Sequence, residues 1–320
     1  MLWAQFVGAC FVIIIAGRKL VSYASSLAEE KGWGNVWVGF TLLAVATSLP
    51  EIFTSAGSVI FIKAPDLALG NILGSILFNI VIIAILDFMN GTDLFMGKTN
   101  MRLILCGSLS IILSTLIIAG ISTSASFTIA RLGPFSIIIL FTYLLGARLI
   151  SRFEKDSPGI YRGNSIINPL LKYLICASFI LGASIWLVHT AEEIAFLTGW
   201  GETFTGVLFL GIATSMPEAT TSISAMRRGA FDMAIGNILG SNMLNVMIVS
   251  ISDVFMPGAG ILSMVSVNHI FTAVLGILMT ATVIVGIIYK SKTSFLRLGF
   301  DAIAIIIMYV AGSYLLFCMR

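Results

Sequence analysis

Charged residues are scarce in this sequence, and their scarcity excludes a water-soluble protein. Of the 320 residues, 10% are charged and 58% are hydrophobic, whereas about a quarter of the residues of a soluble domain are charged. Several uninterrupted apolar runs reach about 20 residues, the length at which an α-helix crosses a bilayer. These runs do not alternate apolar and polar positions, which excludes a transmembrane β-barrel. We predict an all-α polytopic membrane protein.

Cysteine and histidine are also rare. The four cysteines stand singly in apolar runs without metal-ligand spacing, and the chain has two histidines, so zinc and copper sites are not expected. No resident cofactor is predicted. The net charge of +3 does not indicate nucleic-acid binding, because the basic residues of a membrane protein set its topology.

Ten membrane segments are predicted, joined by short connections. The most polar connection, "SRFEKDSPGIYRGN", follows the fifth segment and divides the chain into two five-helix halves, residues 1–160 and 161–320. The expected segments are 2–28, 36–62, 67–88, 101–121, 127–149, 167–196, 203–226, 231–253, 267–289 and 297–317.

Lysine and arginine predict the orientation, since cytoplasmic loops are enriched in them. With the N-terminus outside, thirteen basic residues fall on the cytoplasmic side and three on the other, with Arg18 and Lys19 left uncounted inside the first segment. We therefore expect a multi-pass protein of the cell membrane with both termini extracytoplasmic. The cytoplasmic set is Lys31, Lys98, Arg102, Arg148, Arg152, Lys155, Arg162, Lys172, Arg227, Arg228, Lys290, Lys292 and Arg297, and the opposite set is Lys63, Arg131 and Arg320.

The chain is internally duplicated. "GWGNVWVGFTLLAVATSLPE" (32–51) and "GWGETFTGVLFLGIATSMPE" (199–218) are identical at 10 of 20 positions, and "GNILGSILFNIVIIAILD" (70–87) and "GNILGSNMLNVMIVSISD" (236–253) at 10 of 18. Five segments separate equivalent positions, so the second copy crosses the membrane upside down. Inverted repeats of this kind are typical of secondary transporters, whose sites lie near the midplane between the repeats.

The first repeated block places polar oxygens beside a proline. On a helix, Thr47, Ser48 and Glu51 lie on neighbouring positions of one face, and Pro50 lacks the N–H that would bond the carbonyl of Ala46. A carboxylate and freed carbonyls at membrane depth are tolerated where they line a cavity or find other donors. The second repeat supplies the equivalent residues Thr214, Ser215, Pro217 and Glu218.

The second block adds a hydroxyl and an amide four residues apart. These are Ser75 with Asn79, matched by Ser241 with Asn245, and nearby glycines with small-xxx-small spacing permit close helix packing. Together the four motifs supply two carboxylates, two amide oxygens and several hydroxyls. Such an oxygen set suits a hard cation such as Ca²⁺. The predicted metal ligands are Glu51, Glu218, Asn79, Asn245, Thr47, Ser48, Thr214, Ser215, Ser75 and Ser241.

Two glutamates close together in a low dielectric repel each other unless they are neutralised. One divalent cation neutralises both, and so do two monovalent cations or two protons. A site that must be neutral while it changes access therefore favours exchange of a divalent cation for monovalent ions. This charge balance predicts an antiporter.

"ATSLPE" and "ATSMPE", each followed by "GNILGS" and an asparagine, resemble the two α-repeats of the cation/calcium exchanger superfamily, in particular its prokaryotic sodium/calcium exchanger-like branch. The resemblance covers nearly the whole chain. It implies Ca²⁺ export against an inward monovalent-cation gradient, ion binding by the ten residues named above, and sliding of the first and sixth helices to alternate access. It also implies Ca²⁺ and monovalent cations as substrates. Membrane lipid is expected to surround the protein, and we expect a monomer.

Three positions depart from the family pattern. Sodium/calcium exchangers of this branch commonly have an acidic residue where this chain has Asn245, and glycine where it has Ala46 and Ala213. The proton-coupled branch usually reads Gly-Asn-x-x-Glu in place of Thr-Ser-x-Pro-Glu, and that pattern is absent. The motif therefore favours Na⁺ as the counter-ion, while the two carboxylates leave Ca²⁺/H⁺ exchange open.

Two other classes of function are weighed. A cation channel would be expected to carry a filter segment or subunit symmetry, whereas this chain carries two inverted copies. An intramembrane protease would be expected to carry a catalytic Gly-Asp motif, and this chain has none. For four further acids we expect structural roles: hydrogen bonds or interfacial solvation for Asp87 and Asp253, and capping of the third and eighth helices by Asp66 and Asp232.

Overall fold

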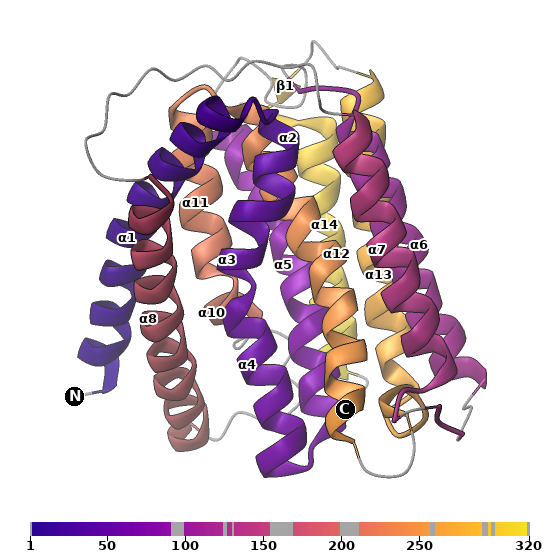
Figure 1. Cartoon of the computed structure of the whole chain (residues 1–320). Helices are drawn as coiled ribbons and strands as arrows, with labels where there is room; N and C mark the ends of the chain where they lie inside the picture. The colour runs from indigo at the N-terminus through magenta and orange to yellow at the C-terminus, as the bar shows by residue number, and fades with distance from the viewer. Residues whose placement is uncertain are drawn as a thin grey trace.

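Eight long helices make up most of the chain in the computed structural model (Figure 1). The structure describes residues 2–90, 99–123, 127–129, 131–153, 169–198, 211–256, 260–289, 294–295 and 298–318. The long helices are α1 (Leu2–Lys31), α5 (Pro65–Asn90), α6 (Leu103–Thr123), α7 (Pro134–Phe153), α8 (Pro169–Thr198), α12 (Phe231–Phe255), α13 (Asn268–Tyr289) and α14 (Phe300–Cys318). Each is long and apolar enough to cross a membrane.

A ninth span is broken in its middle. It comprises α2 (Asn35–Val38), the π-helix η1 (Gly39–Leu43), α3 (Ala44–Thr47), α4 (Leu49–Gly57) and the π-helix η2 (Ser58–Ile62). It bends by 40° where α3 meets α4. Pro50 lies in the first turn of α4, where a missing N–H costs no helical hydrogen bond. The proline therefore starts a new helix instead of kinking a continuous one.

The second repeat contains the same break. There α10 (Gly211–Thr214) is followed by α11 (Met216–Arg227), with Pro217 in the first turn. These helices occupy the later part of the expected seventh segment, 203–226, whose earlier part lies outside the described residues. The other nine expected segments coincide with described spans, although the fifth begins at Pro134 and not at 127. The short elements η5 (Ile261–Ser263), β1 (Ser294–Phe295) and β2 (Leu298–Gly299) lie in connections.

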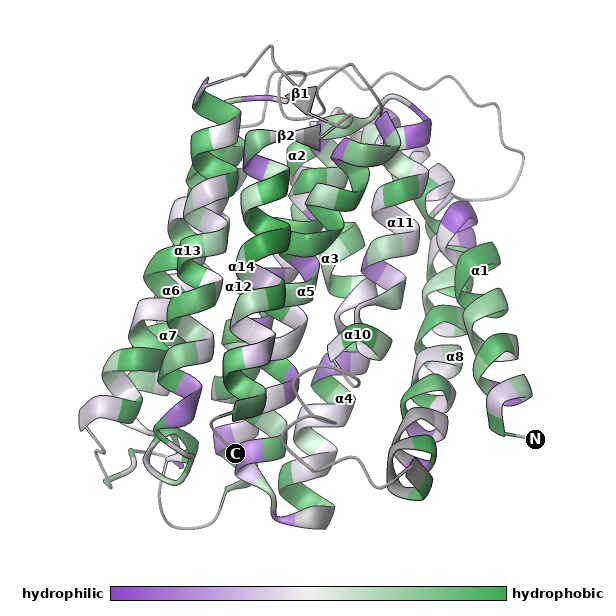
Figure 2. Ribbon diagram, turned by 180° about the vertical axis from the view of Figure 1, so that it is seen from behind, coloured by the Kyte–Doolittle hydropathy of each residue, from purple (hydrophilic) through white to green (hydrophobic). Residues whose placement is uncertain are grey.

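The duplicated helices α5 and α12 form the centre of the bundle and pack against each other and against both broken spans. In the most apolar 18-residue stretch of α5 and of α12, more than seven-tenths of the residues are buried. The corresponding share is 22% in α7 and α14, which lie at the periphery. Between the ends of the outer helices, hydrophobic residues predominate (Figure 2). The helices α1 and α8 pair along one edge (Figure 1). Both ends of the chain lie at the same end of the bundle (Figure 1), as an even number of crossings requires.

Carboxylates near the C-terminal ends of α5 and α12 accept hydrogen bonds from segments that lead into helices of the other half of the chain. Asp87 accepts a hydrogen bond from the Gly299 backbone N–H (2.7 Å), immediately before α14. Its counterpart Asp253 accepts one from Gly133 N–H (2.6 Å), immediately before α7, and another from Ile261 N–H. The N-termini of helices carry unpaired donors, and these buried acids satisfy them. The expected structural role of Asp87 and Asp253 is confirmed.

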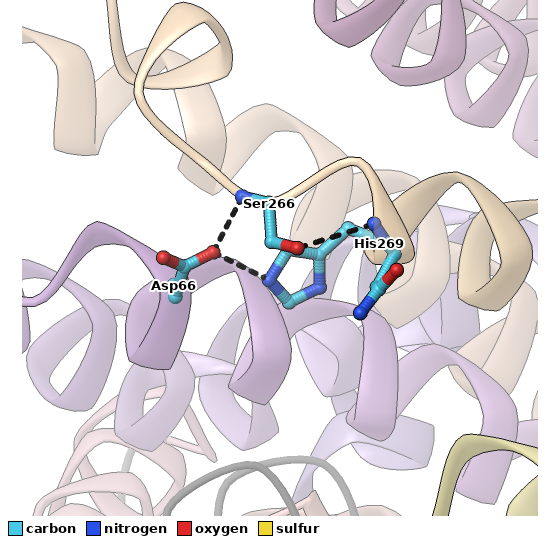
Figure 3. Close-up of polar contacts among 4 residues, drawn as sticks. Asp66, Ser266 and His269 are labelled. Carbon is cyan, nitrogen blue, oxygen red and sulfur yellow. Dashed lines mark hydrogen bonds and ion pairs between the residues drawn. The ribbon is translucent and has the colours of Figure 1, made fainter. Parts of the chain in front are cut away.

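Carboxylates at the N-terminal ends of α5 and α12 make hydrogen bonds of the same kind. Asp66 accepts from Ser266 N–H (2.7 Å) and contacts His269 Nε2 at 3.1 Å, beside the start of α13 (Figure 3). Asp232 accepts from Asn100 N–H (2.7 Å), just before α6. We expected these two acids to cap their own helices; instead each bonds the segment that leads into a helix of the opposite half. Each of the two central helices is therefore hydrogen-bonded at both ends to segments of the opposite half of the chain.

We predict that Asp253→Ala destabilises the protein more than Asp253→Asn does. Alanine leaves two buried N–H groups unpaired, each at a cost of about 1–3 kcal/mol, whereas asparagine retains one carbonyl oxygen as an acceptor. Thermal unfolding in detergent measures the difference, with Thr282→Ala as the control, because the Thr282 hydroxyl donates an exposed hydrogen bond to the Leu278 carbonyl within α13. Equal unfolding temperatures for Asp253→Ala and the control would contradict the assigned role.

Candidate functional site

The two glutamates of the repeated motifs lie in the first turns of α4 and α11, directly after the helix breaks. Ser48 and Ser215 occupy the breaks, with ψ near 5°, so α3 and α10 end there and new helices begin. Glu51 and Glu218 are fully buried. The partial positive charge of a helix N-terminus favours a carboxylate in the first turn, which partly offsets the cost of burial.

Glu218 contacts both repeats. Its Oε1 accepts hydrogen bonds from Ser48 Oγ (3.2 Å), in the first half of the chain, and from Ser241 Oγ (3.1 Å), on α12. Thr47 Oγ1 lies 3.5 Å from the same Ser241 hydroxyl. The Thr-Ser pair of the first repeat therefore lies against the carboxylate and the serine of the second.

Glu51 occupies the equivalent place on the other side of the site. The hydroxyls of Thr214 and Ser75 flank it and lie 2.9 Å from each other. The carboxylates of Glu51 and Glu218 are close enough to interact electrostatically. The four sequence motifs thus converge at one place in the bundle, as the inverted repeat predicts.

The two asparagines differ in their surroundings. Asn79 Nδ2 donates to Asn242 Oδ1 (2.9 Å), and Asn242 in turn donates to the Ile76 carbonyl (3.4 Å). The side chain of Asn245 has no hydrogen-bond partner among the described residues, although it is fully buried. Asn79 is therefore held with its Oδ1 free, whereas neither end of the Asn245 amide is fixed.

Buried oxygens without a partner are concentrated in this region. Leaving a buried polar atom unpaired costs about 1–3 kcal/mol, and more for a charged group, so a cluster of them indicates a site that a ligand completes. No group of three or more His, Cys, Asp or Glu occurs in the described part of the chain, so neutral oxygens must complete any coordination shell. The unpartnered atoms from the ten predicted residues are Glu51 Oε1 and Oε2, Glu218 Oε2, Asn79 Oδ1, Asn245 Oδ1 and Nδ2, and Ser215 Oγ.

Glycines permit the close approach that forms the site. A Cβ added to Gly211, at the start of α10, would lie 2.8 Å from the Gly74 carbonyl carbon on α5. One added to Gly240 on α12 would lie 2.7 Å from Phe40 Cα in η1. Both broken spans therefore touch the central helices backbone to backbone, which places short hydroxyl and amide side chains within reach of the glutamates.

Three further asparagines belong to the site region and were not predicted. Thr47 Oγ1 and Thr214 Oγ1 each lie 3.4 Å from the Oδ1 of an asparagine, Asn237 and Asn71 respectively. Both stand four residues before the predicted serine on the same helix face, so their spacing offered a signal. Asn242 offered none, because its counterpart in the first repeat is Ile76.

Comparison with known proteins identifies the family and the fold of the chain. Residues 1–150 and 170–318 match the family model described as sodium/calcium exchanger protein. The chain is 23% identical to sodium/calcium exchanger MaX1 of Methanosarcina acetivorans, covering 96% of both chains. It is 29% identical to inner membrane protein YrbG of Escherichia coli (strain K12), covering 77% of both. The fold matches the solved sodium-calcium exchanger NCX_Mj with a TM-score of 0.71 at 18% identity, over 97% of this chain and 96% of that one.

Fold and site together define a secondary transporter built from two inverted five-helix repeats around a buried carboxylate pair. The chain belongs to the sodium/calcium exchanger family. It is a multi-pass membrane antiporter of the cation/calcium exchanger class and not an enzyme, which confirms those predictions.

Proposed function

We propose that this protein exchanges Ca²⁺ for Na⁺ by alternating access, and that Glu51 and Glu218 together hold one Ca²⁺. The observation that carries the proposal is a pair of fully buried carboxylates in which three of the four oxygens, Glu51 Oε1 and Oε2 and Glu218 Oε2, have no hydrogen-bond partner. One divalent cation balances both charges, and two Na⁺ ions do the same on the return step. The similarity to MaX1 and NCX_Mj, both sodium/calcium exchangers, supports this choice of ions.

The remaining ligands in this proposal are the neutral oxygens of the same four motifs. Thr47, Ser48, Ser75 and Asn79 would serve from residues 1–160, and Thr214, Ser215, Ser241 and Asn245 from residues 161–320. Ca²⁺ accepts six to eight such oxygens. In this proposal both termini face away from the cytoplasm across the cell membrane, as the distribution of basic residues indicates.

A transport assay with exchanged gradients tests the counter-ion. Proteoliposomes are loaded with Na⁺ or given a pH difference, and Ca²⁺ uptake is measured under each gradient separately. We expect uptake under the Na⁺ gradient. Uptake that responds to the pH gradient alone would replace Na⁺ with H⁺, and Ca²⁺ flux with no counter-flow would indicate a channel.

In the same assay, Glu51→Gln and Glu218→Gln are each expected to abolish Ca²⁺ uptake. Glutamine preserves the side chain's shape but removes one of the two charges that a divalent ion requires. Asp87→Asn is the matched control, because Asp87 lies at the far end of α5 and bonds Gly299. Retained uptake in either glutamine variant would contradict the paired-carboxylate site.

Asn245→Asp is expected to change the dependence of transport on Na⁺ or pH. The buried Asn245 amide has no partner among the described residues, so a carboxylate there adds a third charge to the site without breaking an existing bond. Ca²⁺ uptake is measured across a series of Na⁺ concentrations and pH values. Curves that overlay those of the unmodified protein would show that position 245 lies outside the ion path.

A further inference from the structure

A groove separate from the ion-binding site lies between α1 and α8 on the outside of the bundle. Its volume is about 440 Å³, and all of its lining residues come from these two helices. Phe11 and Phe179, on its two walls, are 63% and 61% exposed. The groove therefore opens toward the lipid that surrounds membrane-spanning helices and not into the core.

One end of this groove is basic. Lys19 of α1 and Lys172 of α8 line it, and Lys172 Nζ lies 5.6 Å from the centre of the Tyr23 ring. The rest of the lining is mainly apolar and aromatic. Two ammonium groups at one end of an apolar channel complement an amphiphile with a negative headgroup.

The two helices run antiparallel, which fixes the direction of the groove. Lys172 lies against Tyr23, toward the end of α1, and a Cβ on Gly8, toward its beginning, would lie 3.6 Å from Trp186. Lys172 belongs to the first turn of α8, so both lysines can extend their ammonium groups toward the headgroup layer at that end of the bundle. Phe179 lies about two turns deeper, at the depth of acyl chains.

The lysine pair is not imposed by the inverted repeat. Helices α1 and α8 are both 30 residues long, and in the register of the repeated motifs Leu2 corresponds to Pro169. Lys19 then corresponds to Trp186, and Lys172 to Gln5. The equivalent surface at the opposite end of the helix pair therefore has an indole and an amide where this end has two positive charges.

We propose that this groove binds an anionic diacyl phospholipid, with the headgroup phosphate between Lys19 and Lys172 and an acyl chain along Ile15, Ile175 and Phe179. In the orientation proposed above, the lipid comes from the cytoplasmic leaflet. Binding itself requires neither that orientation nor the proposed ion exchange.

Native mass spectrometry of the detergent-purified protein tests the proposal independently of transport. Phosphatidylglycerol and phosphatidylcholine with identical chains are titrated separately. We expect the unmodified protein to bind phosphatidylglycerol more tightly than phosphatidylcholine. In Lys19→Gln/Lys172→Gln this preference should fall by a factor on the order of 10. In Lys19→Arg/Lys172→Arg, which keeps both charges, the preference should be unchanged. The control is Arg148→Gln/Arg152→Gln on α7, which removes the same charge away from the groove.

The proposal would be overturned if Arg148→Gln/Arg152→Gln lost as much of the preference for phosphatidylglycerol as Lys19→Gln/Lys172→Gln does. It would also be overturned if the unmodified protein showed no headgroup preference. A second measurement places the lipid without removing either lysine. In Phe179→Trp, brominated phosphatidylglycerol should quench the added fluorescence at lower mole fraction than brominated phosphatidylcholine. Identical quenching by the two lipids, or displacement of the brominated lipid by soluble glycerol phosphate, would show that no anionic lipid is selected there.

Discussion

The structure depends on two carboxylates held together inside an apolar bundle. Glu51 and Glu218 are fully buried, and neither takes part in an ion pair among the described residues. Charged groups are expensive at membrane depth, and only part of that cost is offset by the helix N-termini and the hydroxyls beside Glu218. The fold therefore maintains a site whose charge must be balanced from outside, by cations or by protons.

The inverted repeat explains how this site is assembled. Each repeat breaks one span immediately before its glutamate, and each break lies against the central helix of the other repeat, as the contacts of Thr47 with Ser241 and of Thr214 with Ser75 show. Acids at both ends of α5 and α12 bond segments leading into helices of the opposite half. The halves are thus interlocked at the centre and at both ends, while α1 and α8 pair with each other along one edge.

The sequence predicted the ten-span fold and the convergence of the four motifs, because duplication revealed both the topology and the equivalent residues. It could not predict features that break the repeat or depend on distant partners. Asn242 has an aliphatic counterpart, so no pattern indicated that it would hold Asn79. Asp66 and Asp232 suggested local caps, and the correct partners lie 200 and 132 positions away in the chain, where local spacing carries no information.

Calcium binding to the purified protein, followed by isothermal titration, tests the central claim most directly. A site shared by the two glutamates predicts one Ca²⁺ per chain, with Glu51→Gln, Glu218→Gln and the double variant all losing binding to the same extent. Partial binding in each single variant and additive losses in the double variant would show that the carboxylates act independently, and would contradict the shared site.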